Sequence, residues 1–141
     1  QIPPTKRSAI IHQQAVVALV ERDGRYLVAR RPSQGVWGGL WEFPNRVTES
    51  IPDQKSALKE LLCRHFGLEV RVVEMLTRLM YGIMDRQVEL SAYVCACHAG
   101  EATPTEHTEV RWLSPAELSG PAMPSPHRAV ADTLSETLRR R

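Results

Sequence analysis

The chain lacks several features that would assign it to a class of protein at once. It has no apolar run near the roughly 20 residues that cross a membrane, no signal peptide with a basic start and an apolar middle, and no internal repeat or low-complexity tract. Its 18 basic and 16 acidic residues leave a formal net charge of +2, which permits contact with nucleic acid without requiring it. These absences exclude a membrane-spanning protein and predict a cytoplasmic one.

Cysteine is also scarce. Cys63, Cys95 and Cys97 form an odd-numbered set that lacks the spacing of a zinc site. Cys95 and Cys97 alternate along a predicted strand, which favours structural thiols; a redox or metal role is the alternative. We therefore expect no cofactor within this chain.

What is present is the composition of one globular domain. The 141 residues are 43% hydrophobic and 24% charged, which is enough for a single core. Residues 1–11 begin with QIPPTKRSAI, a basic, proline-containing stretch that predicts an interdomain linker; the alternative is a trimmed free-standing protein. Residues 12–141 are predicted to form one domain, which is expected to be monomeric.

Turn signals predict strands in the first third of the chain. Asp23 and Gly24 separate two apolar runs, residues 14–20 and 25–30, and an Asp-Gly pair in that position is typical of a β-hairpin. Residues 40–43 predict a short strand that ends at a proline.

Cap and stop signals predict a helix in the middle of the chain. Asp53 is suited to cap a helix over residues 54–66, and Gly67 is suited to end it. Residues 68–80 are rich in β-formers, and residues 88–97 alternate between apolar and polar side chains, which predicts two further strands joined by a tip.

The C-terminal part predicts a strand and two helices. After a short strand at 109–113, Ser114 and Glu117 form a capping box for a short helix. Ser125 and Pro126 open a terminal helix. The residues predicted to face inward on it are Ala129, Val130, Thr133, Leu134 and Leu138. The order of elements predicts an α/β fold with a mixed sheet packed between helices.

Residues 38–68, GGLWEFPNRVTESIPDQKSALKELLCRHFGL, resemble a Nudix box, G-x5-E-x7-R-E-U-x-E-E-x-G-U, in which U is aliphatic. Anchoring the pattern on Gly67 and Leu68 fixes its other positions without a gap. The defining glycine, glutamates and arginine are then replaced, in order, by Arg46, Pro52, Glu60, Leu61, Arg64 and His65. In that family the glutamates hold magnesium, which bridges the diphosphate and activates water. The resemblance implies the Nudix fold without the metal, and hence binding without hydrolysis.

Two segments, RRPSQGVWGGLWEFP (30–44) and MPSPHRAV (123–130), are similar to hallmark segments of the C-terminal domain of MutY-type adenine DNA glycosylases. The resemblance covers about residues 12–138. It implies a chain without catalytic residues that recognises 8-oxoguanine, in a protein that removes adenine opposite it. The implied partners are DNA carrying 8-oxoguanine opposite adenine and a preceding glycosylase domain. That preceding domain would hold the glycosidic chemistry and an iron–sulfur cluster, and the whole would associate with the bacterial nucleoid.

The resemblance also assigns a recognition loop. The family's Phe-Ser-His triplet falls on Asp85, Arg86 and Gln87, which departs from the family and is similar to the tip of MutT-like hydrolases. Arg86 is suited to a phosphate or carbonyl oxygen, and Gln87 to a base edge. A solvated hairpin tip is the alternative interpretation.

The remaining DNA-contact candidates follow from the two similar segments. His127 aligns with the family histidine before the last helix, where it either contacts DNA or is a satisfied structural group. Trp37, beside Arg31 and Ser33, either stacks on a base or plugs the edge of the domain.

Two other functions remain open. One is a divergent, free-standing Nudix hydrolase of oxidised or other nucleoside triphosphates, in which Glu60, Glu106 and Glu109 improvise a metal site. Glu106, His107 and Glu109 form a loose acidic and imidazole cluster, but a partial ligand set binds a divalent ion poorly. The other is a protein-interaction domain that kept the fold as a scaffold.

Overall fold

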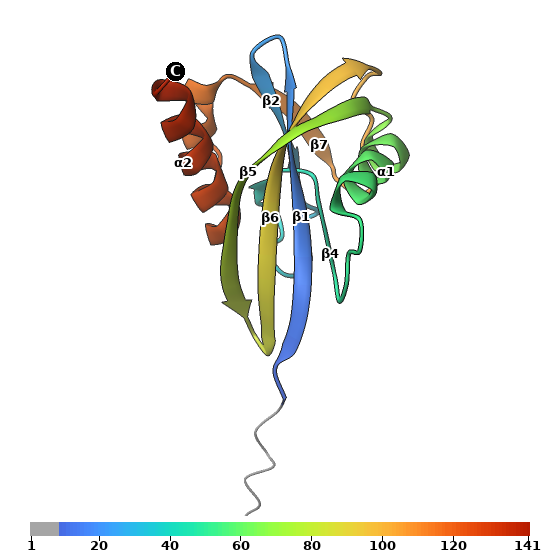
Figure 1. Ribbon diagram of the computed structural model, residues 1–141, viewed down its shortest axis with the longest axis vertical. Coiled ribbons are helices and arrows are strands. Elements are labelled where there is room, and N and C mark those ends of the chain that lie inside the picture. Colours follow the sequence, from blue (N-terminus) through green and yellow to red (C-terminus); the bar gives the residue numbers. More distant parts are fainter. Residues whose placement is uncertain (1–8) are drawn as a thin grey trace, which may run out of the picture.

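The computed structural model describes residues 9–141, which form a mixed β-sheet between two helices (Figure 1). The strands are β1 (Ile11–Arg22), β2 (Arg25–Arg30), β3 (Trp41–Glu42), β4 (Asn45–Thr48), β5 (Glu69–Ile83), β6 (Arg86–Ala99) and β7 (Glu109–Leu113). The helices are α1 (Gln54–Phe66), the short 3-10 helix η2 (Pro115–Ser119) and α2 (Ser125–Arg139). The predicted α/β architecture is confirmed. No helix within the described part of the chain is long and apolar enough to cross a bilayer.

β1 is the central strand of the sheet. The order is β3-β2-β1-β6-β5, with β4 also paired to β1 and β7 to β2. β1 and β6 run parallel, from Ile11 opposite Arg86 to Glu21 opposite Ala96, whereas the other pairs are antiparallel. A strand covered on both faces needs a continuous apolar run, and residues 15–20 of β1 are all buried.

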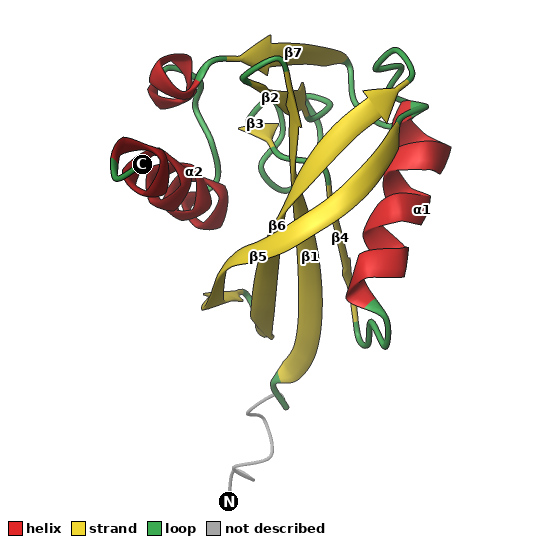
Figure 2. Ribbon diagram, turned by 45° about the horizontal axis from the view of Figure 1, so that its top comes forward, coloured by secondary structure: helices red, strands yellow, loops and turns green. Residues whose placement is uncertain are grey.

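The two faces of the sheet pack against different helices (Figure 2). Because side chains alternate along a strand, Val17 of β1 lies in the core under α2 and Val16 in the core under α1. α2 contributes Val130 and Leu134 to the first core, and α1 contributes Leu62 to the second.

Several predicted details are wrong, each for a reason of packing. Ser91 and Tyr93 of β6, predicted to be the polar face, are buried because α1 covers them; Tyr93 donates its hydroxyl hydrogen to Gln54. On α2, Val130 and Leu134 are buried as predicted, but Ala131 is buried in place of Ala129, so the apolar face is turned slightly toward Ala131.

The structure also changes the predicted β5–β6 tip and adds one strand. The turn is Met84–Asp85, so Arg86 and Gln87 belong to β6. β4 was not predicted; it follows Pro44 and pairs antiparallel with β1, with Arg46 opposite Val16.

The predicted bounds of α1 are confirmed, because both ends carry local signals. The Asp53 carboxylate accepts a hydrogen bond from the Ser56 amide at 3.1 Å, which caps the first turn. Gly67 has a left-handed φ of 69°, and its amide donates to the Cys63 carbonyl. These caps fix where the exposed face of the helix points.

Replacing Gly67 with alanine should lower the free energy of unfolding by about 1 kcal/mol, because a Cβ disfavours the left-handed conformation. The added carbon meets only the Glu101 carbonyl oxygen at 3.5 Å, an ordinary contact, so backbone strain is the cause. Urea unfolding measures the change. Gly120→Ala is the control, because Gly120 caps η2 with an ordinary φ of −77° and should cost little. If both variants lose the same free energy of unfolding, the left-handed φ of Gly67 is not the cause.

Candidate functional site

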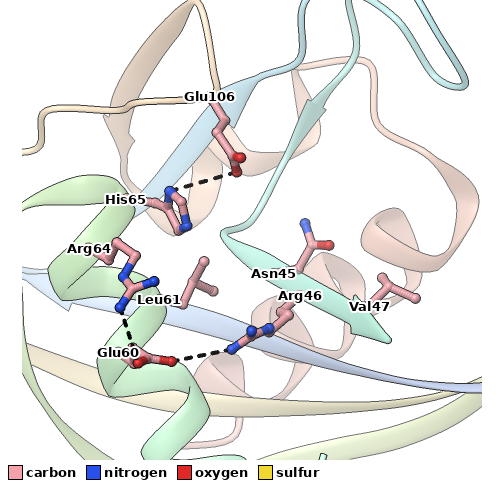
Figure 3. A pocket seen from close by; sticks show the side chains of 8 residues that line it. All are labelled: Asn45, Arg46, Val47, Glu60, Leu61, Arg64, His65 and Glu106. Atoms are coloured by element: carbon pink, nitrogen blue, oxygen red, sulfur yellow. Dashed lines mark hydrogen bonds and ion pairs between the residues drawn. The ribbon is translucent and has the colours of Figure 1, made fainter. Parts of the chain in front are cut away.

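A polar pocket of about 320 Å³ lies between β4, α1 and the segment before β7 (Figure 3). It is lined by Asn45, Arg46, Val47, Glu60, Leu61, Arg64, His65 and Glu106. Apart from Pro52, which lines a neighbouring pocket, the degenerate Nudix positions predicted from the sequence are all brought together here. The register of α1 and its cap place Glu60, Arg64 and His65 on one face of the helix, and β4 places Arg46 beside them.

Three charged side chains of the pocket form a chain of ion pairs (Figure 3). An Nη1 of Arg46 lies 3.4 Å from Oε1 of Glu60, and Nη2 of Arg64 lies 3.6 Å from Oε2 of the same carboxylate. All three side chains are at least half exposed, so each pair contributes only about 0–1 kcal/mol. The single helical carboxylate is thus engaged by two guanidinium groups.

His65 lies on the same helix, beside Glu106 and at the other end of the pocket from Glu60 (Figure 3). Its Nδ1 lies 2.8 Å from the Thr105 hydroxyl oxygen and 3.8 Å from a carboxylate oxygen of Glu106. The Thr105 amide donates to the His65 carbonyl at 3.0 Å, which ties the segment before β7 to the end of α1. The second ring nitrogen lies on the side away from Glu106 (Figure 3). Thr105 was not predicted as a site residue, because no sequence motif marks it and it lies 40 residues from His65.

The magnesium that the glutamates of a complete Nudix box hold does not fit this donor set. A hard divalent cation takes about six oxygen ligands, and within residues 9–141 no group of three or more His, Cys, Asp or Glu side chains is placed to hold a metal ion. Glu109, proposed as a ligand with Glu60 and Glu106, does not line the pocket; its carboxylate lies 3.0 Å from Arg111. The improvised three-glutamate site is therefore not assembled.

A second cluster of polar groups is buried at the start of α2. The Glu42 side chain is 4% exposed and lies 2.8 Å from Nε2 of His107 and 3.2 Å from Nη1 of Arg31. The Phe43 amide donates to Nδ1 of His127 at 3.2 Å, and Nε2 of His127 is 3.8 Å from Glu42. These contacts connect β3, the segment before β7, and α2.

The surroundings shift the pKa of two members of this Glu42 cluster. Burial favours the neutral acid, but the hydrogen bond from His107, together with the positive charge of Arg31, outweighs it and leaves the pKa of Glu42 below its usual value. Burial lowers the pKa of His127 to about 4, although the negative charge of Glu42 opposes this. At neutral pH the cluster therefore holds a carboxylate and a neutral His127.

Acid should destabilise the fold through His127. Between its unfolded pKa of 6.5 and its folded pKa of about 4, the unfolded chain binds more protons than the folded chain. The free energy of unfolding therefore falls as the pH drops through this window, by on the order of 3 kcal/mol in all. Urea unfolding from pH 7 to 4 measures this slope. His127→Gln keeps an acceptor for the Phe43 amide and should flatten the dependence of the unfolding free energy on pH. An unchanged dependence would show that His127 is not its cause.

The predicted DNA-contact residues lie in three parts of the fold. Asp85 lies in the turn between β5 and β6 and pairs at 3.7 Å with Arg86, the first residue of β6, which Gln87 follows. Arg31 and His127 belong to the Glu42 cluster, and His127 is only 4% exposed, so its ring is a satisfied structural group. Ser33 is exposed on the loop before β3.

The two tryptophans near β3 have different surroundings. Trp37 is partly buried, with its ring centroid 6.2 Å from that of Tyr81 on β5. Trp41 lies in the core. The contact with Tyr81 shows that Trp37 packs against the sheet at the domain edge.

The three cysteines differ in how deeply they are buried. Cys95 is buried in the core under α1, and burial raises the pKa of its thiol to about 12. Cys95 is therefore an unreactive structural thiol at neutral pH. Cys63 is exposed on α1, and Cys97 is partly buried.

Comparison with known proteins identifies the family. The family model described as "NUDIX domain" matches residues 15–133. A CTP pyrophosphohydrolase of Escherichia coli is 34% identical over 113 residues, which are 79% of this chain and 84% of the relative. An 8-oxo-dGTP diphosphatase of Proteus vulgaris is 26% identical over 89 residues, 63% of this chain and 80% of the relative. The solution structure of the E. coli ORF135 protein has a TM-score of 0.78 and 30% identity, with 92% of each chain covered.

These relatives overturn the glycosylase interpretation. The chain is similar over most of its length to proteins named as nucleotide-cleaving hydrolases, and it spans most of their length as well. The expected partners, DNA with 8-oxoguanine and a preceding glycosylase domain, are therefore wrong, and so is the expectation of an inert module of an adenine glycosylase. The nucleoid association, which depended on that interpretation, loses its support. The chain belongs to the family of NUDIX domain proteins.

Proposed function

We propose that this chain is a nucleoside triphosphate pyrophosphohydrolase, which adds water to a nucleoside triphosphate and releases the monophosphate and pyrophosphate. The observation that carries the proposal is the pocket on α1, which combines two guanidinium groups with an oriented imidazole. The relative named as a CTP pyrophosphohydrolase supports the reaction class. No cofactor within the chain is part of the proposal.

The size of the pocket supports the assignment of the phosphates to it. Ligand pockets measure roughly 300–1,000 Å³, and about 320 Å³ is at the lower end of that range. We assign the pocket to the diphosphate group that is cleaved, with the sugar and base outside it. Arg46 on β4 and Arg64 on α1 approach from two elements, and guanidinium groups bind phosphate oxygens through paired hydrogen bonds.

His65 is assigned as the base that activates water. With its proton on Nδ1, the imidazole donates to the Thr105 hydroxyl beside Glu106, which leaves Nε2 as an acceptor. The water oxygen bonds to phosphorus on one side of the α–β bridge, the bridging P–O bond breaks, and the proton of the water passes to Nε2. The departing phosphate oxygen then takes that proton, which restores the imidazole.

The direct test is release of pyrophosphate by the purified chain from a panel of substrates: the four common nucleoside triphosphates, their deoxy forms and 8-oxo-dGTP. The proposal expects pyrophosphate and monophosphate in equal amounts from at least one substrate, above a blank without protein. No release from any member of the panel would contradict it. The ranking of substrates also decides whether oxidised or normal nucleotides are preferred.

A further inference from the structure

The charges of the pocket differ in kind from those of a metal site. Two arginines and two glutamates line it and balance formally, and the carboxylate of Glu60 lies between the two guanidinium groups. A divalent cation placed at Glu60 would lie beside two positive charges at close range and would lack most of its oxygen ligands. The region to which the Nudix pattern assigns a cation therefore already holds two guanidinium groups.

We propose that Arg46 and Arg64 bind the phosphate oxygens directly, in place of a divalent cation, and that Glu60 is an internal anion which the phosphates displace from them. The inference deepens the proposed function and rests on it for the identity of the ligand. It assigns to Glu60 a role opposite to that of a metal ligand, because here the carboxylate competes with the substrate.

The exposure of the three side chains makes the displacement inexpensive. Arg46 is 50% exposed, Arg64 69% and Glu60 55%, so water replaces the ion pairs readily. A diphosphate carries more negative charge than one carboxylate and offers several oxygens to each guanidinium fork. Arg46 is anchored on β4 by pairing with β1, and Arg64 lies one turn after Glu60 on α1, so both cations stay in place when Glu60 turns away.

Inorganic pyrophosphate is the probe, titrated calorimetrically into the whole chain in EDTA and again in magnesium. The proposal expects binding in EDTA. Glu60→Gln should tighten that binding by about tenfold, because it removes the competing charge. Arg46→Ala and Arg64→Ala should each weaken it by about tenfold. Circular dichroism and thermal unfolding establish that each variant is folded.

The chain supplies a matched control. Glu136 on α2 also lies between two arginines, Arg139 at 2.9 Å and Arg140 at 3.1 Å, but outside the pocket. Glu136→Gln changes the net charge equally and should leave pyrophosphate affinity within about twofold of the unmodified chain, since exposed pairs contribute little.

Three results would overturn the inference: no binding in EDTA, weaker binding by Glu60→Gln, or equal tightening by Glu136→Gln. Weakening by Glu60→Gln that occurs in magnesium and not in EDTA would assign Glu60 to a metal. Failure of the proposed function is a separate outcome, because a chain that binds pyrophosphate in EDTA and releases none from nucleotides would retain this inference and lose the enzymatic activity.

Discussion

Replacing His65 with glutamine should lower the rate constant for pyrophosphate release by at least about 100-fold, the usual contribution of a general base. The glutamine amide still reaches toward Thr105 but cannot take a proton from water at neutral pH. Substrate affinity should change little, because the phosphates are held by Arg46 and Arg64. Rapid-quench measurements at saturating substrate separate the chemical step from binding.

His98 provides the control for this prediction. It is an exposed histidine near the end of β6 and does not line the α1 pocket. His98→Gln should leave the rate unchanged. An unchanged rate in His65→Gln, or a raised KM with a normal kcat, would show that His65 binds substrate or is uninvolved, and the base would have to be another group.

Replacing Glu42 with alanine should lower the free energy of unfolding by about 3–5 kcal/mol, the usual cost of removing one partner from a buried charged network. Removing the Glu42 carboxylate leaves His107 without its 2.8 Å partner and Arg31 without its counter-charge. It also opens a gap beside His127. Chemical denaturation at neutral pH measures the change. Because Arg31 is about one-third exposed, the lower end of the range is expected.

A surface glutamate tests whether the burial of Glu42 causes the large expected loss of stability. Glu109 forms ion pairs with Arg111 and Arg30 but is 40% exposed, so Glu109→Ala should cost no more than about 1 kcal/mol. A Glu42→Ala loss as small as that would mean that the buried network contributes specificity of packing and not stability.

Helix α1 was predictable from sequence because its signals are local. Asp53, Gly67 and the apolar positions between them lie within one short segment, and each acts on its own neighbours. The degenerate box positions Glu60, Arg64 and His65 follow from that helix, so the sequence placed most of the pocket on one face.

The rest depends on contacts between distant residues. β4 has no alternating pattern and becomes a strand only because β1 offers a partner. The parallel pairing of β1 with β6 joins residues about 75 positions apart, and it leaves β6 with two buried faces where alternation predicted one. The partnership of His65 with Thr105 also joins two elements that no local pattern connects.

The glycosylase interpretation failed for a structural reason. Its two motifs, residues 30–44 and 123–130, meet in one place, where the Phe43 amide donates to His127 and where Glu42 binds Arg31. These residues hold β3 against α2 and are buried or engaged within the fold. Motifs of this kind indicate the scaffold, whereas the proposed function is assigned to the pocket on α1.

The most direct test of the central claim, that arginine side chains replace the cation in this Nudix pocket, is the release of pyrophosphate in EDTA and in magnesium from the nucleotide that the substrate panel ranks first. The account predicts the same rate within about twofold in both, because no step depends on a divalent ion. Release that occurs in magnesium and disappears in EDTA would contradict it.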